Sequence, residues 1–516
     1  MATTIISPAE PERSPASVAA PYLEAVQRYA RRDAGRFHVP GHKGGSGAGE
    51  QLTSALGSGL ALDVPSCIEG IDLGHGETPL QAAQRCAAAT WGARRTWFLV
   101  NGASEASHAI CLALARPGTE VVVQRNVHAS TIHGLVLGGL RPTFVMPGVD
   151  EDLGIAHCVH PDDLADTLDR TPGAAAAFVV SPTYFGATAD VHGLAQVCHD
   201  RGVVLVVDEA WGAHLRFDAR LPEDALAAGA DVVISGTHKL IGSLTQSAML
   251  HLGARRWPQL DEAAISRALA LVRTTSPSSL LLGSLDAARA HVDARGAALL
   301  DSALAQMQEV KQRLRDVLGL RVLGDELVGS HGVAGFDGLR LAIDIGPTGL
   351  DGDVVAADLL RVADINLELV TSRILIAHVG IAEPVLAGGT RLIRALQKVL
   401  GTTGSYPAGD VAPAQAACFG EAVMSPREAF FAEHEAVALA DAAGRISADS
   451  IAVYPPGIAN LLPGERITPR LVQYLLEMSL RGCPLRGTWD EATRSVRVLR
   501  RPLTARPQHA LSQETI

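Results

Sequence analysis

Between residues 80 and 250 the chain alternates short apolar strands with helical patterns, and this alternation constrains its fold more than any other feature. The strand candidates are 96–100, 120–124, 175–180, 203–207 and 231–234. Short, nearly continuous apolar strands separated by helices are typical of a parallel sheet covered on both faces. The sequence therefore predicts an α/β fold built on a mostly parallel sheet.

The size of the chain predicts several domains. At 516 residues it is too long for one compact core. We expect an N-terminal arm and linker at 1–45, a large α/β domain at 46–330, a small α/β domain at 331–405 and a C-terminal α+β domain at 406–516. In the small domain, strands are expected at 339–345, 367–370 and 374–379, with helices at 352–362 and 384–400.

The net charge and the cysteine pattern limit which classes of partner and which cellular compartment we expect. A net charge of -11 gives no reason to expect nucleic acid or an anionic membrane as a partner. The seven cysteines are scattered without a C-x-x-C pair, which fits a reducing compartment better than a disulfide framework. No apolar run reaches the length of a membrane span. We expect a soluble, cytoplasmic protein.

Polar side chains follow the predicted strands, at the sheet edge where ligands bind in open parallel sheets. Gly102, Ala103 and Ser104 follow the first strand and open a helix, an arrangement suited to a phosphate group. Ser104 as an ordinary helix cap is the alternative. His128 follows the second strand and is either a ring-stacking residue or a hydrogen-bonded structural histidine. Thr183 follows the third strand and offers a hydroxyl.

The fourth strand ends in a carboxylate. Asp208 closes the apolar run 203–207, and a carboxylate there is costly unless a cation neutralises it. A protonated pyridine nitrogen would do so and would make the ring a better electron acceptor. The alternative is an aspartate that caps the following helix.

The fifth strand leads to an amine. Lys239 stands beside Ser235, Thr237 and His238 and is one of only four lysines, the others being Lys43, Lys311 and Lys398. The amine could form a Schiff base with an aldehyde cofactor while the neighbouring hydroxyls bind its phosphate. An ordinary surface lysine is the alternative. Taken together, the five strand ends predict a site for pyridoxal 5'-phosphate. No metal is expected, because the nearby His and Asp residues lack a compact ligand spacing.

The chain resembles the ornithine/lysine/arginine decarboxylases, a pyridoxal-phosphate family with the aspartate-aminotransferase fold (fold type I), in its short form without a wing domain. The resemblance spans residues 21 to 490. It is carried by these segments: 37–43 (FHVPGHK), 98–102 (FLVNG), 125–128 (RNVH), 180–184 (VSPTY), 207–210 (VDEA), 237–239 (THK), 242–246 (GSLTQ), 274–278 (TTSPS), 426–430 (PREAF), 454–458 (YPPGI) and 463–465 (PGE).

The resemblance implies roles for single residues. Lys239 would carry the cofactor, Asp208 would pair with its pyridine nitrogen and His128 would stack on its ring. Further cofactor contacts are expected from Gly102, Ala103, Ser104, Thr183, Trp211, Ser235, Thr237 and His238.

The chain also departs from the family at three places. Gly236 stands where the family has a phosphate-binding serine, three residues before the lysine. Trp211 stands where short members usually carry histidine, and Ala459-Asn460 replaces the usual continuation of the 454–458 motif.

The resemblance implies a homodimer, or a higher homo-oligomer, that decarboxylates arginine, lysine or ornithine to the amine. Lys239 or His238 would return a proton to the α-carbon. Glu465 is the candidate for reading the distal cation of the substrate. Two alternatives remain open: another pyridoxal-phosphate reaction on a basic amino acid, namely oxidation, elimination or transamination, and a catalytically inactive regulatory homologue.

Overall fold

A computed structural model describes residues 19–32, 34–402, 419–453, 459–480, 485–487 and 495–500. Most of the expected N-terminal arm, the linker after residue 402 and the 454–458 motif lie outside the described residues. Across the described ranges, no helix combines the length and the apolar character needed to cross a bilayer.

A seven-stranded mixed sheet forms the centre of the molecule, in the order β1-β10-β9-β8-β6-β2-β3. The five strands from β9 to β3 are parallel, whereas β10 runs antiparallel to both β9 and β1. The predicted mostly parallel sheet is therefore present, with β3 and β10 as strands that the sequence patterns did not indicate. The bounds are β1 (Arg95–Leu99), β2 (Glu120–Gln124), β3 (Arg141–Val145), β6 (Ala174–Val180), β8 (Val204–Asp208), β9 (Val232–Ser235) and β10 (Ala248–Leu252).

Alternate side chains of these strands enter two separate cores. Leu205 and Val207 of β8 pack in one apolar cluster, whereas Val204 and Val206 pack in the other. Both faces are covered, which explains why the strands read as unbroken apolar runs. The covering helices and the long helix that follows them are α3 (Pro79–Trp91), α4 (Gly102–Leu114), α5 (Ala129–Gly138), α6 (Pro161–Asp169), α7 (Val191–Asp200), α9 (Glu262–Val272) and α10 (Ser279–Leu318).

Local signals set the limits of these helices. In α3, Thr78 and Gln81 form a reciprocal capping box at the start, and Gly92 adopts a left-handed φ of 68° at the end. Between these limits Ala83, Ala87 and Trp91 recur on one face and are buried. The helix therefore begins and ends where its sequence dictates and presents an apolar face to the core.

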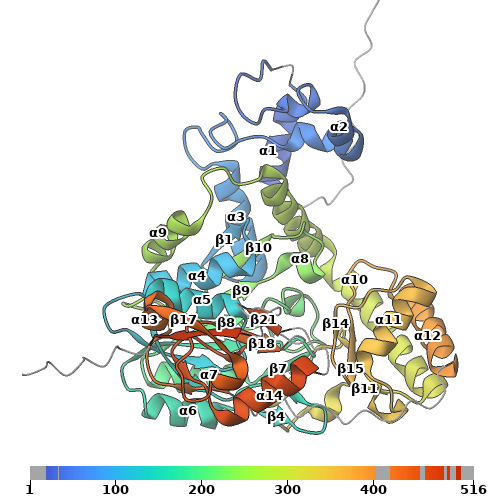
Figure 1. The fold of residues 1–516 in the computed structure, drawn as a ribbon. Coiled ribbons are helices and arrows are strands. Elements are labelled where there is room, and N and C mark those ends of the chain that lie inside the picture. Colours follow the sequence, from blue (N-terminus) through green and yellow to red (C-terminus); the bar gives the residue numbers. More distant parts are fainter. Residues whose placement is uncertain are drawn as a thin grey trace, which may run out of the picture.

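Helix α10 connects the two ends of the molecule (Figure 1). Its 40 residues span about 60 Å at the usual rise per residue. Near its start it contacts α1 (Pro21–Ala30), and near its end it contacts α12 (Val385–Thr402). There a second, antiparallel sheet has the order β11-β13-β15-β14. Its elements are β11 (Arg321–Val322), β13 (Leu341–Asp344), α11 (Gly352–Ala363), β14 (Leu369–Val370) and β15 (Ile374–Ala377).

The C-terminal part packs against the central unit near α5 (Figure 1). It contains small antiparallel sheets and a compact apolar cluster of its own. Its elements are β16 (Glu421–Ala422), α13 (Pro426–Phe431), β17 (His434–Ala438), β18 (Ile451–Val453), β19 (Ala459–Leu461), β20 (Glu465–Arg466), α14 (Pro469–Leu480), β21 (Leu485–Gly487) and β22 (Ser495–Leu499). The four-part division proposed from the sequence stays a prediction, although each expected unit after residue 45 contains a sheet of its own.

Candidate active site

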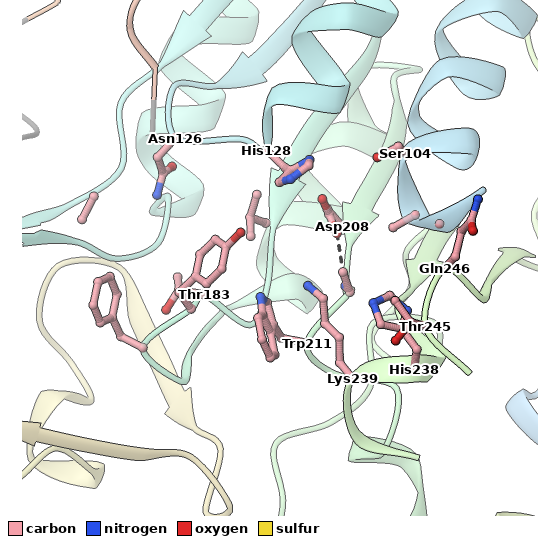
Figure 2. A pocket seen from close by; sticks show the side chains of 17 residues that line it. Ser104, Asn126, His128, Thr183, Asp208, Trp211, His238, Lys239, Thr245 and Gln246 are labelled. Carbon is pink, nitrogen blue, oxygen red and sulfur yellow. Dashed lines mark hydrogen bonds between the residues drawn. The ribbon is translucent and has the colours of Figure 1, made fainter. Parts of the chain in front are cut away.

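A cavity of about 330 Å³ lies where β2, β6, β8 and β9 end. The side chains that the strand-end argument singled out converge on it from separate segments of the chain (Figure 2). The predicted residues that line it are Gly102, Ala103, Ser104, His128, Thr183, Asp208, Trp211, His238 and Lys239.

Lys239 lies on the short helix α8 (Thr237–Leu240), directly after β9. Its ammonium nitrogen is 3.8 Å from the ring centroid of Trp211. Burial lowers the pKa of Lys239 to about 8, with the charge of Asp208 acting in the opposite direction. A larger fraction of this amine is therefore neutral near pH 7 than for an exposed lysine, which makes it a better nucleophile.

Asp208 is the last residue of β8 and points toward the cavity (Figure 2). One carboxylate oxygen accepts a hydrogen bond from the backbone N–H of Ala210 at 3.1 Å. Within the described residues it has no ion-pair partner within 4.0 Å. A half-buried carboxylate without a counter-cation suits a ligand that brings a positive charge of its own.

His128 forms the cap of α5 and opens onto the cavity. The backbone N–H of Ser130 donates to its Nδ1 at 3.2 Å, so Nδ1 is the acceptor and Nε2 carries the proton of the neutral ring. Desolvation in this concave site lowers the pKa of His128, against the opposing effect of Asp208. A neutral imidazole fixed in this way can stack on a flat ring.

The start of α4 forms a cradle for an anion. The side chain of Asn101 does not cap this helix, so the N–H groups of Ala103 and Ser104 have no capping side chain. The preceding turn is held by Glu105, which is fully buried and accepts the backbone N–H groups of Val100 and Asn101 at 3.2 and 3.1 Å. The cradle therefore keeps both its shape and its free donors.

Arg273, the residue directly after α9, supports this cradle. Its Nε lies 2.9 Å from a carboxylate oxygen of Glu105, so the buried acid is paired. On the cavity wall, Thr183 is buried and its hydroxyl has no hydrogen-bond partner among the described residues. A buried hydroxyl without a partner is unfavourable, and a ligand oxygen in the cavity would satisfy it.

Ser235 and Thr237, expected as phosphate ligands, do not line the cavity. Ser235 is fully buried in β9, where it pairs with Met249. The hydroxyl of Thr237 donates to the carbonyl oxygen of Ser247 at 3.2 Å and accepts from Ser243 at 2.9 Å. The hydroxyl of Ser235 has no hydrogen-bond partner among the described residues, whereas that of Thr237 is engaged. The role of these two residues as phosphate ligands in place of the missing serine stays a prediction.

Glu465 also lies elsewhere. It is buried away from the cavity wall, and both its oxygens accept hydrogen bonds from Arg125 at 3.1 Å. A carboxylate already paired in this way is not available to a substrate cation. In this structure Glu465 forms an internal ion pair, and its role in reading the substrate cation stays a prediction.

Four further residues with polar side chains line the cavity and were not singled out from the sequence. Asn126, Thr245 and Gln246 line the cavity beside the predicted set (Figure 2), and Tyr184 lines it as well. All four stand inside the family-like segments or directly next to them, so a stricter reading of those segments would have found them. Gln246 has a φ of 79°, and its carbonyl accepts the N–H of Gly102, which joins the loop after α8 to the anion cradle.

The site as a whole fits a flat, phosphorylated, cationic ring with an aldehyde. It offers uncapped helix donors for the phosphate, Asp208 for a ring cation, His128 for the ring face and Lys239 for the aldehyde. Within the described ranges, no group of three or more His, Cys, Asp or Glu side chains is arranged to hold a metal ion.

Comparison with known proteins gives consistent matches. Residues 20–337 match the model of the Orn/Lys/Arg decarboxylase major domain, and residues 411–482 match that of the C-terminal domain. An arginine decarboxylase of Halalkalibacterium halodurans is 33% identical, over 93% of this chain and 97% of that protein. An arginine decarboxylase of Bacillus subtilis is 32% identical, over 93% and 98%.

Solved structures agree on the fold. The lysine decarboxylase LdcF of Francisella novicida superposes with a TM-score of 0.79 at 19% identity, covering 93% of this chain and 81% of that one. This confirms the predicted fold class, the transferase-like fold type I of pyridoxal-phosphate enzymes. Because the major-domain match covers well over half of the sequence, the chain is a decarboxylase that belongs to the Orn/Lys/Arg decarboxylase family.

Proposed function

We propose that this protein uses pyridoxal 5'-phosphate to decarboxylate a basic amino acid, with L-arginine as the first candidate and agmatine and CO2 as products. The observation that carries the proposal is the meeting of Lys239, Asp208 and His128 at one cavity beside an uncapped helix start. The choice of arginine is supported by the names of three relatives that are 31–33% identical over 93% of this chain.

Each residue has a task that follows from its surroundings. The first N–H groups of α4 bind the phosphate, His128 covers one face of the ring, and Asp208 keeps a proton on the ring nitrogen. Lys239 holds the cofactor through its ε-amine. When bound, the cofactor withdraws electrons from the substrate α-carbon and stabilises the negative charge left by CO2.

Proton return falls to a group beside the reacting carbon. With a pKa near 8, the Nζ of Lys239 can both hold and release a proton close to neutral pH. His238 is the second candidate, since it also lines the cavity, although its Nδ1 is engaged with the carbonyl oxygen of Ser247 at 2.7 Å. The Nζ of Lys239 is therefore the first candidate for the group that returns the proton to the α-carbon.

The test is product analysis. Purified protein with added pyridoxal phosphate is incubated with carboxyl-labelled arginine, lysine or ornithine, and amine and labelled CO2 are measured by mass. Agmatine and CO2 in equal amounts, absent with Lys239→Ala, support the proposal. Ammonia, peroxide or a keto acid as the main product would exclude decarboxylation as the reaction.

We also propose a homodimer in the cytoplasm. Phe37 is fully exposed and Val39 is 69% exposed in the loop that resembles a family motif, which fits a covered face in the assembly. The described cysteines are unpaired, as expected in a reducing compartment. Light scattering of the purified protein tests the assembly: a monomer at micromolar concentration would exclude it.

A further inference from the structure

Arg340 carries a buried guanidinium whose charge no described residue satisfies by a hydrogen bond. It stands just before β13 and is 2% exposed. None of its three guanidinium nitrogens has a hydrogen-bond partner among the described residues. Burying a charged group in this way is strongly unfavourable unless something else in the fold uses or stabilises the charge.

The guanidinium lies against the wall of the candidate active site. Its central carbon is 4.5 Å from the ring centroid of Trp211, the same ring that has Lys239 Nζ at 3.8 Å. Trp211 and Lys239 line the cavity, whereas Arg340 does not. One indole therefore contacts two cations, one inside the cavity and one outside it. A weakly hydrated, planar guanidinium is suited to stacking of this kind.

Asp337 stabilises the charge of Arg340 without touching it. Asp337 is fully buried, and His214 and the N–H of Leu339 engage one of its oxygens at 3.1 and 3.0 Å. Its other oxygen has no partner among the described residues, and no ion pair joins it to Arg340 within 4.0 Å. The aspartate thus supports the arginine through space and leaves the guanidinium free to stack on Trp211.

We propose that Arg340 is a positioning residue of the active site: its guanidinium fixes the indole of Trp211 and disfavours a second positive charge on Lys239. The inference rests on the proposed role of Lys239 as the cofactor-holding amine. That amine must be neutral to add to a carbonyl group, so a fixed cation behind the wall keeps it ready to react.

The other groups around Lys239 act in both directions. Asp208 and the exposed Glu368 raise the pKa of Lys239, whereas burial and Arg340 lower it. His128 faces the same cavity, and His378 contacts the backbone carbonyl of Lys239. Arg340 is therefore the nearby cation whose removal should have the clearest effect.

The experiment measures the titration of Lys239 directly. The full-length chain, freed of cofactor, is labelled at the ε-carbon of lysine, and the four lysine signals are followed by NMR against pH. Lys239→Ala assigns the signal. Arg340→Met removes the charge but keeps the length of the side chain, and it breaks no guanidinium hydrogen bond among the described residues. Arg340→Lys is the matched control, in which a fifth lysine signal reports the pH range where the new amine is charged.

In Arg340→Met we expect the pKa of Lys239 to rise from about 8 by about one unit, a tenfold loss of neutral amine near pH 7. In Arg340→Lys it should stay close to the wild-type value, and the signals of Lys43 and Lys398 should not move in either variant.

An unchanged titration in Arg340→Met, or an equal shift in both variants, would overturn the inference. If Arg340→Met does not fold, Arg340→Gln replaces it with the same expectation. Product analysis of the wild-type protein tests the proposed function separately, so either idea can fail alone.

Discussion

Arg125 and Glu465 are 340 residues apart in the chain, yet Nη2 of the arginine lies 3.1 Å from both carboxylate oxygens of the glutamate. The side chains are 2% and 3% exposed. Arg125 immediately precedes the cavity residue Asn126 and also donates to the carbonyl oxygen of Ala459 at 2.6 Å. The pair therefore ties the C-terminal part of the chain to the strand end that carries His128.

Breaking this pair should destabilise the fold. Glu465→Ala leaves the buried guanidinium of Arg125 without its counter-charge, and we expect a loss of about 3–5 kcal/mol in the free energy of unfolding. Denaturant titration measures it, with the exposed Glu433→Ala as control. A large rise in KM with unchanged stability would instead restore Glu465 as a substrate ligand.

Lys239→Ala should abolish both turnover and the visible absorbance of bound cofactor, because no other lysine is among the described residues that line the cavity. Lys43→Ala is the control: its side chain contacts the carbonyl oxygen of His38, outside the cavity, so absorbance should persist. Persistent absorbance in Lys239→Ala would show that another residue carries the cofactor.

Asp208→Asn should bind cofactor but lose most of its activity. An ion pair about 4 Å apart at an effective dielectric constant of about 20 is worth about 4 kcal/mol, which corresponds to roughly a 10³-fold loss in kcat. Steady-state kinetics with a parallel absorbance titration separates catalysis from binding. Near-normal kcat would reduce Asp208 to a structural role.

Cofactor capture should depend on pH through Lys239. Burial lowers its pKa to about 8, so the neutral fraction rises tenfold per pH unit below that value and levels off above it. Stopped-flow absorbance of cofactor-free protein should show the same profile in the rate of capture. A rate that still climbs steeply above pH 9 would mean that the amine titrates as an ordinary exposed lysine.

Gly236→Ser should weaken the site. A Cβ at Gly236 would lie 2.6 Å from the carbonyl oxygen of Ala210, so the turn after Asp208 would have to move. We expect a loss of about 1–3 kcal/mol in stability and weaker cofactor binding. Gly236→Ala is the matched control, with the same crowding and no hydroxyl. Tighter binding in the serine variant alone would show that the phosphate site lacks a donor.

Site residues could be predicted from the sequence where a local pattern of strand and polar strand end identifies them. Asp208 and Lys239 follow apolar runs that could only be buried strands, and parallel strands bring their ends together. The local pattern could not place side chains whose position depends on strand burial or on distant pairing. Ser235 lies within β9 and does not line the cavity, and Glu465 pairs with Arg125, a partner that no local pattern identifies.

The missed strands have similar causes. Strand β3 begins with an exposed arginine followed by a proline and is only partly buried along most of its length, so its apolar signal is weak. Strand β10 is fully buried, but its antiparallel direction arises from its pairing with β9 and β1 rather than from its own residues.

The contact between His378 and the backbone carbonyl of Lys239 has a consequence for protein engineering. His378 directly follows β15 of the small antiparallel sheet. Through His378, this sheet contacts the backbone of Lys239, the lysine on which the proposed chemistry depends. Exchanging the small unit for that of a relative would change the reactive centre itself, even if every cavity side chain were kept. A chimera that keeps the contacts of this chain with the reactive centre should have its junctions outside residues 340–378.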